Sequence, residues 1–362
     1  MKLRQWIGLG AALLLAVSLA ACAAGGGASG TDTSAPDTSE AGNSGTPDGS
    51  TKPAEPTASE PSAPDASVPD GTTASPDAGT TAPTSATEES QPHITFRDTS
   101  AGGGSIGSWW WNNSQIKNDA TCTKYLQFLQ DNQVTEVYAS LGGMKAQQIT
   151  EFVRKAAGYG IRVAWLSGDA SWIESGSTGI VDDYLAYQSS APADARLYAL
   201  HLDVEPHQLD LFREDRARAM QLFADFIGKV AAQLHAAGEV IEWDIPFWLE
   251  DDMVTVDGES VKLLTHLARV SDTLCLMSYR DKASQILGVS KEEIAAGETY
   301  GCKIICGVET YSKEGNAVSF MEEGKTVMYR ELETVYTTLK TKSLTAYGVA
   351  IHHVDKWYKL KN

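Results

Sequence analysis

Apolar and ionisable side chains alternate with a period of two along residues 200–205. In a β-strand this spacing places the apolar positions 200, 202 and 204 on one face, and His201, Asp203 and Glu205 on the other. Pro206 has no backbone amide with which to continue a ladder of hydrogen bonds, so we expect the strand to end there. Burying three ionisable side chains costs folding free energy unless they are paired with other groups or serve a function. The stretch is therefore either a functional strand or an edge strand with a solvated polar face, and the flanking sequence favours the first.

Seven further segments have strand-like patterns, and amphipathic stretches of helical period separate most of them. The eight expected strands cover residues 105–111, 134–141, 161–167, 197–205, 240–246, 273–279, 303–309 and 347–353. The expected helical stripes cover residues 149–156, 220–234, 263–267 and 327–339. Strands that alternate with helices predict an α/β fold, here a single (β/α)8 barrel. A doubly wound open sheet is the alternative, but its phosphate loop is lacking. Only residues 355–362 remain for the eighth helix.

The first residues are predicted to be a targeting signal. Lys2 and Arg4 precede an apolar run over residues 6–21 that is too short for a stable membrane span. The run ends in Leu-Ala-Ala-Cys at Cys22, which resembles the lipobox of bacterial lipoproteins. That resemblance implies a signal peptide over residues 1–22, a lipid anchor on Cys22, and a mature protein on the outer face of the cell membrane. An ordinary secretory signal is the alternative.

Composition separates a linker from the folded part of the chain. Residues 23–93 are dominated by Ala, Gly, Ser, Thr, Pro and acidic residues, and no aromatic residue occurs between Trp6 and Phe96. Such a segment cannot bury enough apolar surface to offset its ordering entropy, so we expect a disordered, extended linker there. The barrel then occupies residues 94–362. The formal net charge of −18 leaves no basic face for nucleic acid, and we expect a monomer. Four further cysteines, at 122, 275, 302 and 306, could form disulfides or fill the core.

In a (β/α)8 barrel the carboxyl ends of the strands meet at one mouth, where function is expected. Most of the predicted strand ends carry an aromatic residue, and several carry a carboxylate. Aromatic faces stack on sugar rings and carboxylates accept hydrogen bonds from sugar hydroxyls, so the pattern predicts a carbohydrate-binding cleft. About half of the tryptophans are expected to belong to the core instead. The candidate substrate-binding residues are Trp109, Trp111, Trp165, Asp244, Trp248, Asp281, Tyr311 and His352.

Three short motifs resemble the chitinase-type family 18 of glycoside hydrolases. Ser140 to Gly143 match its Ser-x-Gly-Gly pattern, Asp203 and Glu205 match its Asp-x-Glu pattern, and Met277 and Tyr279 match its Met-x-Tyr pattern. The resemblance implies that Glu205 is the catalytic acid, that Asp203 positions the acetamido group of the substrate, and that Tyr279 holds the carbonyl of that group. Two features depart from the family. His201 stands where another aspartate is usual, and Ser-x-Gly-Gly falls on the second predicted strand.

A second resemblance is to the clan of retaining glycosidases whose acid ends strand four and whose nucleophile ends strand seven. Glu205-Pro206 and Glu309 stand at these positions, although Val204 replaces the usual asparagine. This resemblance implies Glu309 as the nucleophile. The two carboxyl groups are then expected about 5–5.5 Å apart. Asp203 is expected to be hydrogen-bonded to His201 or His352.

Both resemblances imply a glycoside hydrolase without a cofactor, acting on a poly- or oligosaccharide, with N-acetylhexosamine polymers as one candidate. Glycoside cleavage needs a protonated acid at the leaving oxygen and a second group to stabilise the oxocarbenium centre. We expect the like charge of Asp203 and burial to keep Glu205 protonated. Two other classes stay open: a metal-dependent hydrolase or deacetylase using His201, Asp203 and His352, and a non-catalytic sugar-binding lipoprotein.

Overall fold

A computed structural model describes residues 91–311 and 317–362, and these contain a closed parallel barrel of eight strands. Its strand order is β1-β10-β9-β8-β5-β4-β3-β2, so that β1 pairs with both β2 and β10 and leaves no open edge. The predicted (β/α)8 barrel is thereby confirmed, and an open doubly wound sheet is excluded. The predicted signal peptide, Cys22 and nearly all of the predicted linker lie outside the described residues.

All eight predicted strands are present, with ends shifted by at most three residues. Their bounds are β1 (Ser105–Trp110), β2 (Glu136–Ser140), β3 (Arg162–Ser167), β4 (Ala199–Leu202), β5 (Ile241–Pro246), β8 (Thr273–Met277), β9 (Lys303–Glu309) and β10 (Tyr347–His352). The sequence patterns did not predict the antiparallel hairpin of β6 (Met253–Val256) and β7 (Glu259–Lys262), which is inserted after β5.

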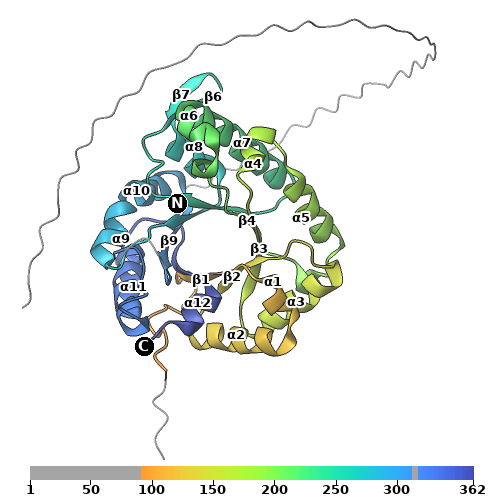
Figure 1. Cartoon of the computed structure of the whole chain (residues 1–362), viewed down its shortest axis with the longest axis vertical. Coiled ribbons are helices and arrows are strands. Elements are labelled where there is room, and N and C mark those ends of the chain that lie inside the picture. The colour runs from red at the N-terminus through yellow and green to blue at the C-terminus, as the bar shows by residue number, and fades with distance from the viewer. Residues whose placement is uncertain (1–90, 312–316) are drawn as a thin grey trace, which may run out of the picture. The chain divides into compact units, whose positions relative to one another are not determined.

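Helices surround the barrel, as Figure 1 shows. Their bounds are α1 (Asn113–Lys117), α2 (Asp119–Asp131), α3 (Ala146–Gly158), α4 (Ser171–Ser175), α5 (Gly179–Ser190), α6 (Asp210–Glu214), α7 (Arg216–Ala236), α8 (Leu263–Val270), α9 (Ala283–Val289), α10 (Lys291–Tyr300), α11 (Lys325–Lys340) and α12 (Val354–Lys359). Two short 3₁₀ segments are η1 (Ala193–Ala195) and η2 (Pro206–Gln208). No helix among the described residues is long and apolar enough to span a membrane.

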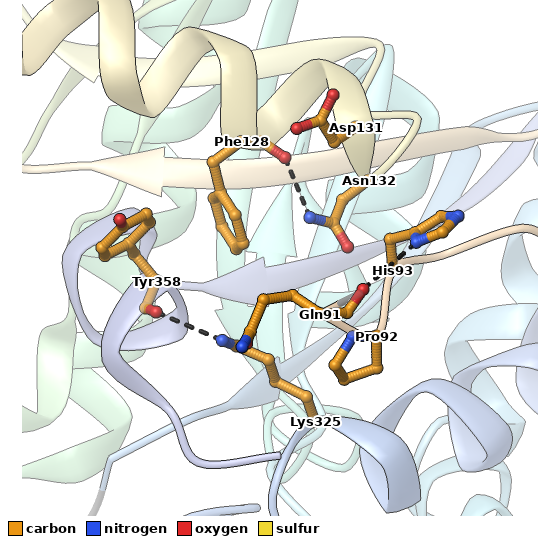
Figure 2. A pocket seen from close by; sticks show the side chains of 8 residues that line it. All are labelled: Gln91, Pro92, His93, Phe128, Asp131, Asn132, Lys325 and Tyr358. Atoms are coloured by element: carbon orange, nitrogen blue, oxygen red, sulfur yellow. Dashed lines mark hydrogen bonds between the residues drawn. The ribbon is translucent and has the colours of Figure 1, made fainter. Parts of the chain in front are cut away.

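The last helix, α12, is only six residues long, as the few residues left after β10 predicted. A cavity of about 600 Å³ lies beside it on the outer wall, where the end of α2 and the start of α11 approach residues 91–93 (Figure 2). Lys325 is buried in its wall and donates a hydrogen bond to the carbonyl oxygen of Tyr358 at 3.2 Å. This cavity is separate from the carboxyl ends of the strands, so size alone does not identify the functional site.

Alternate strand residues point into the barrel and out to the helices, which produces two cores. Leu200, Leu202 and Val204 pack in the outer core between sheet and helices, as the period of two predicted. The inner core is a small cluster that contains Trp109, Tyr138, Ala164, Leu166, Ala199, Cys275, Ile305 and Ala350. Four free cysteines, at 122, 275, 302 and 306, are all buried, so they belong to the core.

A charged layer lies inside the barrel at the amino ends of the strands. Glu136 is fully buried, and it is paired with Lys303 at 2.8 Å and with Arg162 at 2.5 Å. Burial would raise the pKa of Glu136, but the two cations lower it to about 2. The charge of Glu136 is thus compensated by two cations at the floor of the barrel.

Candidate active site

The carboxyl ends of the strands carry a connected group of polar side chains, all at inward-facing positions. Asp244 lies on β5, and Glu309 and His352 end β9 and β10, where they are register partners. Asp203 and Glu205 follow β4, and Tyr279 follows β8. The structure therefore brings together the four predicted catalytic residues with Asp244 and His352.

His201 lies directly beneath this group and is completely buried. It is the register partner of Glu242, and its Nδ1 lies 3.0 Å from Glu242 Oε2. Its Nε2 lies 2.9 Å from Asp244 Oδ2, and its ring stacks on Tyr138 with 3.9 Å between the ring centroids. Burial alone would lower the pKa of His201, but the charge of Asp244 and the contacts with both carboxylates raise it to about 10. The imidazole is therefore a cation at neutral pH.

Asp203 carries the clearest electrostatic perturbation at the mouth. Its backbone amide donates to the carbonyl oxygen of Ser167 at 2.9 Å, which attaches it to the end of β3. The approach is so close that a Cβ on Gly168 would lie 1.8 Å from the Asp203 carbonyl oxygen, so only glycine fits there. Burial and the charges of Asp244 and Glu205 raise the pKa of Asp203 well above its usual value. Its environment therefore favours the protonated form of Asp203.

Glu205 lies at the opening, partly exposed, immediately before η2. Its carboxylate accepts a hydrogen bond from the side-chain amide of Gln208, and its Oε1 lies 3.6 Å from Nε2 of His207. The sequence predicted that Asp203 would raise the pKa of Glu205. The structure shows an effect on Asp203 instead. The charge of Glu205 contributes to raising the pKa of Asp203, which is the more deeply buried of the two groups.

Tyr279 follows β8, which only β5 separates from β4 in the barrel. Burial and the charges of Glu309, Asp244 and Asp203 raise the pKa of its hydroxyl well above the usual value. The hydroxyl therefore stays protonated and can donate a hydrogen bond into the space that Asp203 and Glu205 also face.

Glu309 is held by three donors, and its side chain is almost buried. Its Oε1 accepts hydrogen bonds from the backbone amides of Thr310 at 2.7 Å and Tyr311 at 2.9 Å. Its Oε2 lies 2.7 Å from Nδ1 of His352, whose Nε2 in turn accepts from the indole of Trp111 at 2.9 Å. The two ring contacts place the proton of a neutral His352 on Nδ1. Both oxygens of Glu309 are thus engaged.

The predicted substrate-binding aromatics divide between the mouth and the core. Trp111 and Trp248 are partly buried, and Trp248 packs against His207 and Phe212 beside the opening. Tyr311 is 41% exposed, with the ammonium of Lys356 4.2 Å from its ring centroid. These three can offer aromatic surface to a ligand.

The other two tryptophans correct the prediction. Trp109 is 1% exposed, and its indole donates to Asp244 Oδ2 at 2.7 Å, so it supports the site from below. Trp165 points to the helices, where it lines a pocket of about 420 Å³ beside α3 and α5. On β3 the neighbours Ala164 and Leu166 belong to the inner core, so Trp165 between them faces the helices.

Asp281 is partly buried beyond β8, and its Oδ1 has no hydrogen-bond partner among the described residues.

The expectation that Asp203 bonds to His201 or His352 is wrong, because the ring nitrogens of both histidines face other residues. The sequence analysis did not predict Glu242 and Tyr138, which contact the ring of His201. Glu242 lies two residues before Asp244, so the period of two that predicted Asp244 could also have revealed it.

The arrangement supplies a buried carboxyl group with a raised pKa (Asp203), a second carboxyl group at the opening (Glu205) and the hydroxyl donor of Tyr279. The described residues contain no group of three or more His, Cys, Asp or Glu side chains that could hold a metal ion. Both ring nitrogens of His352 are hydrogen-bonded to neighbouring side chains, and His201 has Nδ1 hydrogen-bonded to Glu242 and Nε2 2.9 Å from Asp244 Oδ2.

No protein-family model and no curated protein matches this sequence. Solved structures that resemble it include a GH18 chitinase from Pseudoalteromonas aurantia, 10% identical over 69% of this chain and 94% of that chain, with a TM-score of 0.43. The spore cortex-lytic enzyme SleL of Bacillus megaterium is 9% identical over 71% of this chain and 73% of that chain, with a TM-score of 0.44. A GH18 chitinase from Cycas revoluta, in complex with (GlcNAc)3, is 11% identical over 70% and 96%, with a TM-score of 0.41. Identities and TM-scores this low carry no argument, and the (β/α)8 barrel rests on the strand pairing of this chain itself.

Proposed function

We propose that the barrel is a glycoside hydrolase that cleaves glycans containing an N-acetylhexosamine, with Glu205 as the general acid. The observation that supports this most is the grouping of Asp203, Glu205 and Tyr279 around one space at the barrel mouth. These are the residues that the family 18 resemblance implies for catalysis assisted by the acetamido group of the substrate.

Each group has a role that its environment suits. Glu205, at the opening, protonates the oxygen of the departing sugar. The acetamido carbonyl oxygen of the bound sugar attacks the anomeric carbon from the other side, and the Tyr279 hydroxyl donates a hydrogen bond to that oxygen and orients it. Asp203 Oδ1, which has no partner among the described residues, accepts from the acetamido N–H. Water then opens the cyclic intermediate, with Glu205 acting as base.

Glu309 suits a positioning role better than that of a nucleophile. Its two oxygens are engaged by two backbone amides and by His352, whereas a nucleophile must present a free lone pair to the anomeric carbon. In the proposed mechanism Glu309 fixes the tautomer of His352, and it adds to burial in raising the pKa of the Tyr279 hydroxyl.

A series of aryl glycosides tests the proposal. The matched substrates carry N-acetyl, N-fluoroacetyl, N-trifluoroacetyl or hydroxyl groups at the 2-position. Because fluorine withdraws electrons from the attacking carbonyl oxygen, we expect kcat to fall along the series by roughly two powers of ten, with no hydrolysis of the 2-hydroxy sugar. A flat series would identify a protein nucleophile, and loss of activity with EDTA would favour a metal-dependent hydrolase. Binding without turnover of any substrate would identify a sugar-binding protein.

We further propose that Cys22 anchors the protein by a lipid to the outer face of the cell membrane. The support is the Leu-Ala-Ala-Cys sequence after a short apolar run. Cys22→Ser should move the protein from the membrane fraction to the soluble fraction, with loss of the lipid mass from its N-terminal peptide. Lipid-free wild-type protein, or a mature N-terminus at another residue, would disprove the anchor.

A further inference from the structure

The cavity on the outer wall, between α2, α11 and residues 91–93, contains a buried lysine that the proposed reaction does not use. Lys325 is the first residue of α11 and is 5% exposed, and its side chain extends toward α12 (Figure 2). The cavity volume of about 600 Å³ is that of a site for a small molecule. Gln91, His93 and Asp131 line the cavity and are exposed, so it opens to solvent.

The ammonium group of Lys325 has no ion-pair partner among the residues that the structure describes. It donates one hydrogen bond, to the carbonyl oxygen of Tyr358 at 3.2 Å, and Nζ lies 5.8 Å from the ring centroid of Phe128. An ammonium group has three N–H donors, so two are left over within this part of the chain. Burying a charge without a partner costs folding free energy. Burial lowers the pKa of Lys325, and no described acidic group raises it.

The polar side chains that line the cavity do not supply the missing negative charge. Asp131 is exposed, and its carboxylate accepts a hydrogen bond from the side-chain amide of Gln127 at 2.8 Å rather than from Lys325. The side-chain oxygen and nitrogen of Asn132 are both bonded to backbone groups, at 3.1 and 2.9 Å. Nδ1 of His93 lies 3.3 Å from a backbone carbonyl oxygen at the rim.

Aromatic surface forms another part of the cavity wall. The rings of Phe128 and Tyr358 have 5.2 Å between their centroids, and Pro92 lines the same cavity (Figure 2). Flat apolar molecules pack well against such rings. The cavity therefore suits a molecule with a negative group at one end and an apolar body at the other.

We propose that this cavity binds a small molecule that carries a carboxylate on an apolar, flat body, with Lys325 as the counter-ion of the carboxylate. The carboxylate accepts hydrogen bonds from the remaining donors of Lys325, and the body packs against Phe128 and Pro92. Binding removes the cost of a buried ammonium group without a partner, and an uncharged molecule of the same shape cannot do this. The proposal does not rest on the proposed hydrolase activity, because the cavity is separate from the barrel mouth.

Titration of the full chain with benzoate and with benzamide tests the need for charge, because the two probes have nearly the same shape. We expect benzoate to bind with a Kd of about 1 mM or below, and benzamide at least tenfold more weakly. In protein with nitrogen-15-labelled lysine, benzoate should shift the ammonium signal of Lys325 and raise its pKa by about one unit. Equal binding of the two probes, or no binding of benzoate, would overturn the proposal.

Lys325→Met removes the charge and nearly keeps the length of the side chain. It should weaken benzoate binding at least tenfold and leave benzamide binding unchanged. Lys229→Met is the matched control, because Lys229 on α7 also donates to one backbone carbonyl oxygen, that of Gly176 at 2.7 Å, but at an exposed position. Unchanged benzoate binding in a folded Lys325→Met variant would contradict the site. If that variant does not fold, the titration of the wild-type protein still decides.

Carboxylates of the chain itself are the competing occupants of the cavity, since Glu89 and Glu88 stand two and three residues before Gln91. The double variant Glu88→Gln/Glu89→Gln separates the two sources. A ligand site predicts the same pKa of Lys325 and the same benzoate affinity in the double variant and the wild type. A lower pKa of Lys325 in the ligand-free double variant, together with tighter benzoate binding, would assign the cavity to those glutamates and overturn the ligand site.

Discussion

Replacement of Glu205 by glutamine is expected to lower kcat/KM by about a thousandfold or more, with folding and sugar binding nearly intact. The amide has almost the same shape as the carboxyl group and keeps an acceptor and a donor for Gln208 and His207, so the opening should not rearrange. It cannot transfer a proton to the departing sugar oxygen, which is a poor leaving group when unprotonated. Steady-state kinetics on the N-acetyl substrate and a binding titration with the corresponding oligosaccharide measure the two effects separately.

Glu214→Gln is the control for this change, because Glu214 is an exposed glutamate on α6 in the same connection between strands. It should retain full activity. An unchanged rate in the Glu205 variant would remove Glu205 from the mechanism. A large fall in affinity together with the rate would instead indicate that Glu205 binds the sugar and that another group supplies the proton.

Replacement of Asp203 by asparagine is expected to change activity and stability in opposite directions. Activity should fall on the order of a hundredfold, because asparagine can turn its –NH2 group instead of its carbonyl oxygen toward the acetamido N–H and then fails to orient that group. Stability at pH 7 should rise by about 1 kcal/mol, or roughly 2–4 °C in melting temperature for a barrel of this size. Kinetics and thermal unfolding of the same preparation measure both changes.

The sign of the stability change follows from the raised pKa of Asp203. The folded state binds this proton more tightly than the unfolded state, so Asp203 costs stability at any pH above its unfolded value near 4. Asparagine removes that cost. The gain should therefore be present at pH 7 and disappear below about pH 4, whereas Asp182→Asn, at an exposed position on α5, should give no gain at either pH. A loss of stability at pH 7 would show that Asp203 is ionised and paired in the folded protein.

The sequence alone determined the architecture, because the signals for it are local. The strand predicted over residues 303–309 and the observed β9 have the same bounds, and the other strands differ by only a few residues. Period-two alternation reports which residues share a face, and helical stripes report which segments cover the sheet. The short last helix followed from the number of residues that remained. The β6–β7 hairpin was missed because its strands are short and mostly exposed, without a buried apolar face to reveal them.

The same local signals located the residues of the candidate site but did not show which way each side chain points. They placed Asp203, Glu205, Tyr279 and Glu309 at strand ends, and a closed barrel necessarily brings strand ends to one mouth. They did not show that Trp165 points to the helices or that Trp109 lies beneath the site. Aromatic residues occur on both faces of a barrel strand, so their presence in the sequence does not indicate which face they occupy. The register of each strand against its neighbours decided that.

Only the tertiary structure decided which charges meet. The register of β4 against β5 places His201 opposite Glu242. The register of β9 against β10 places Glu309 opposite His352. Those pairings place both histidines against other carboxylates, and burial together with the charges of Asp244 and Glu205 raises the pKa of Asp203. Periodicity within one strand carries no information about the side chain across the ladder, and the pKa of a buried carboxyl depends on that side chain and on burial, both of which exist only after the barrel has closed.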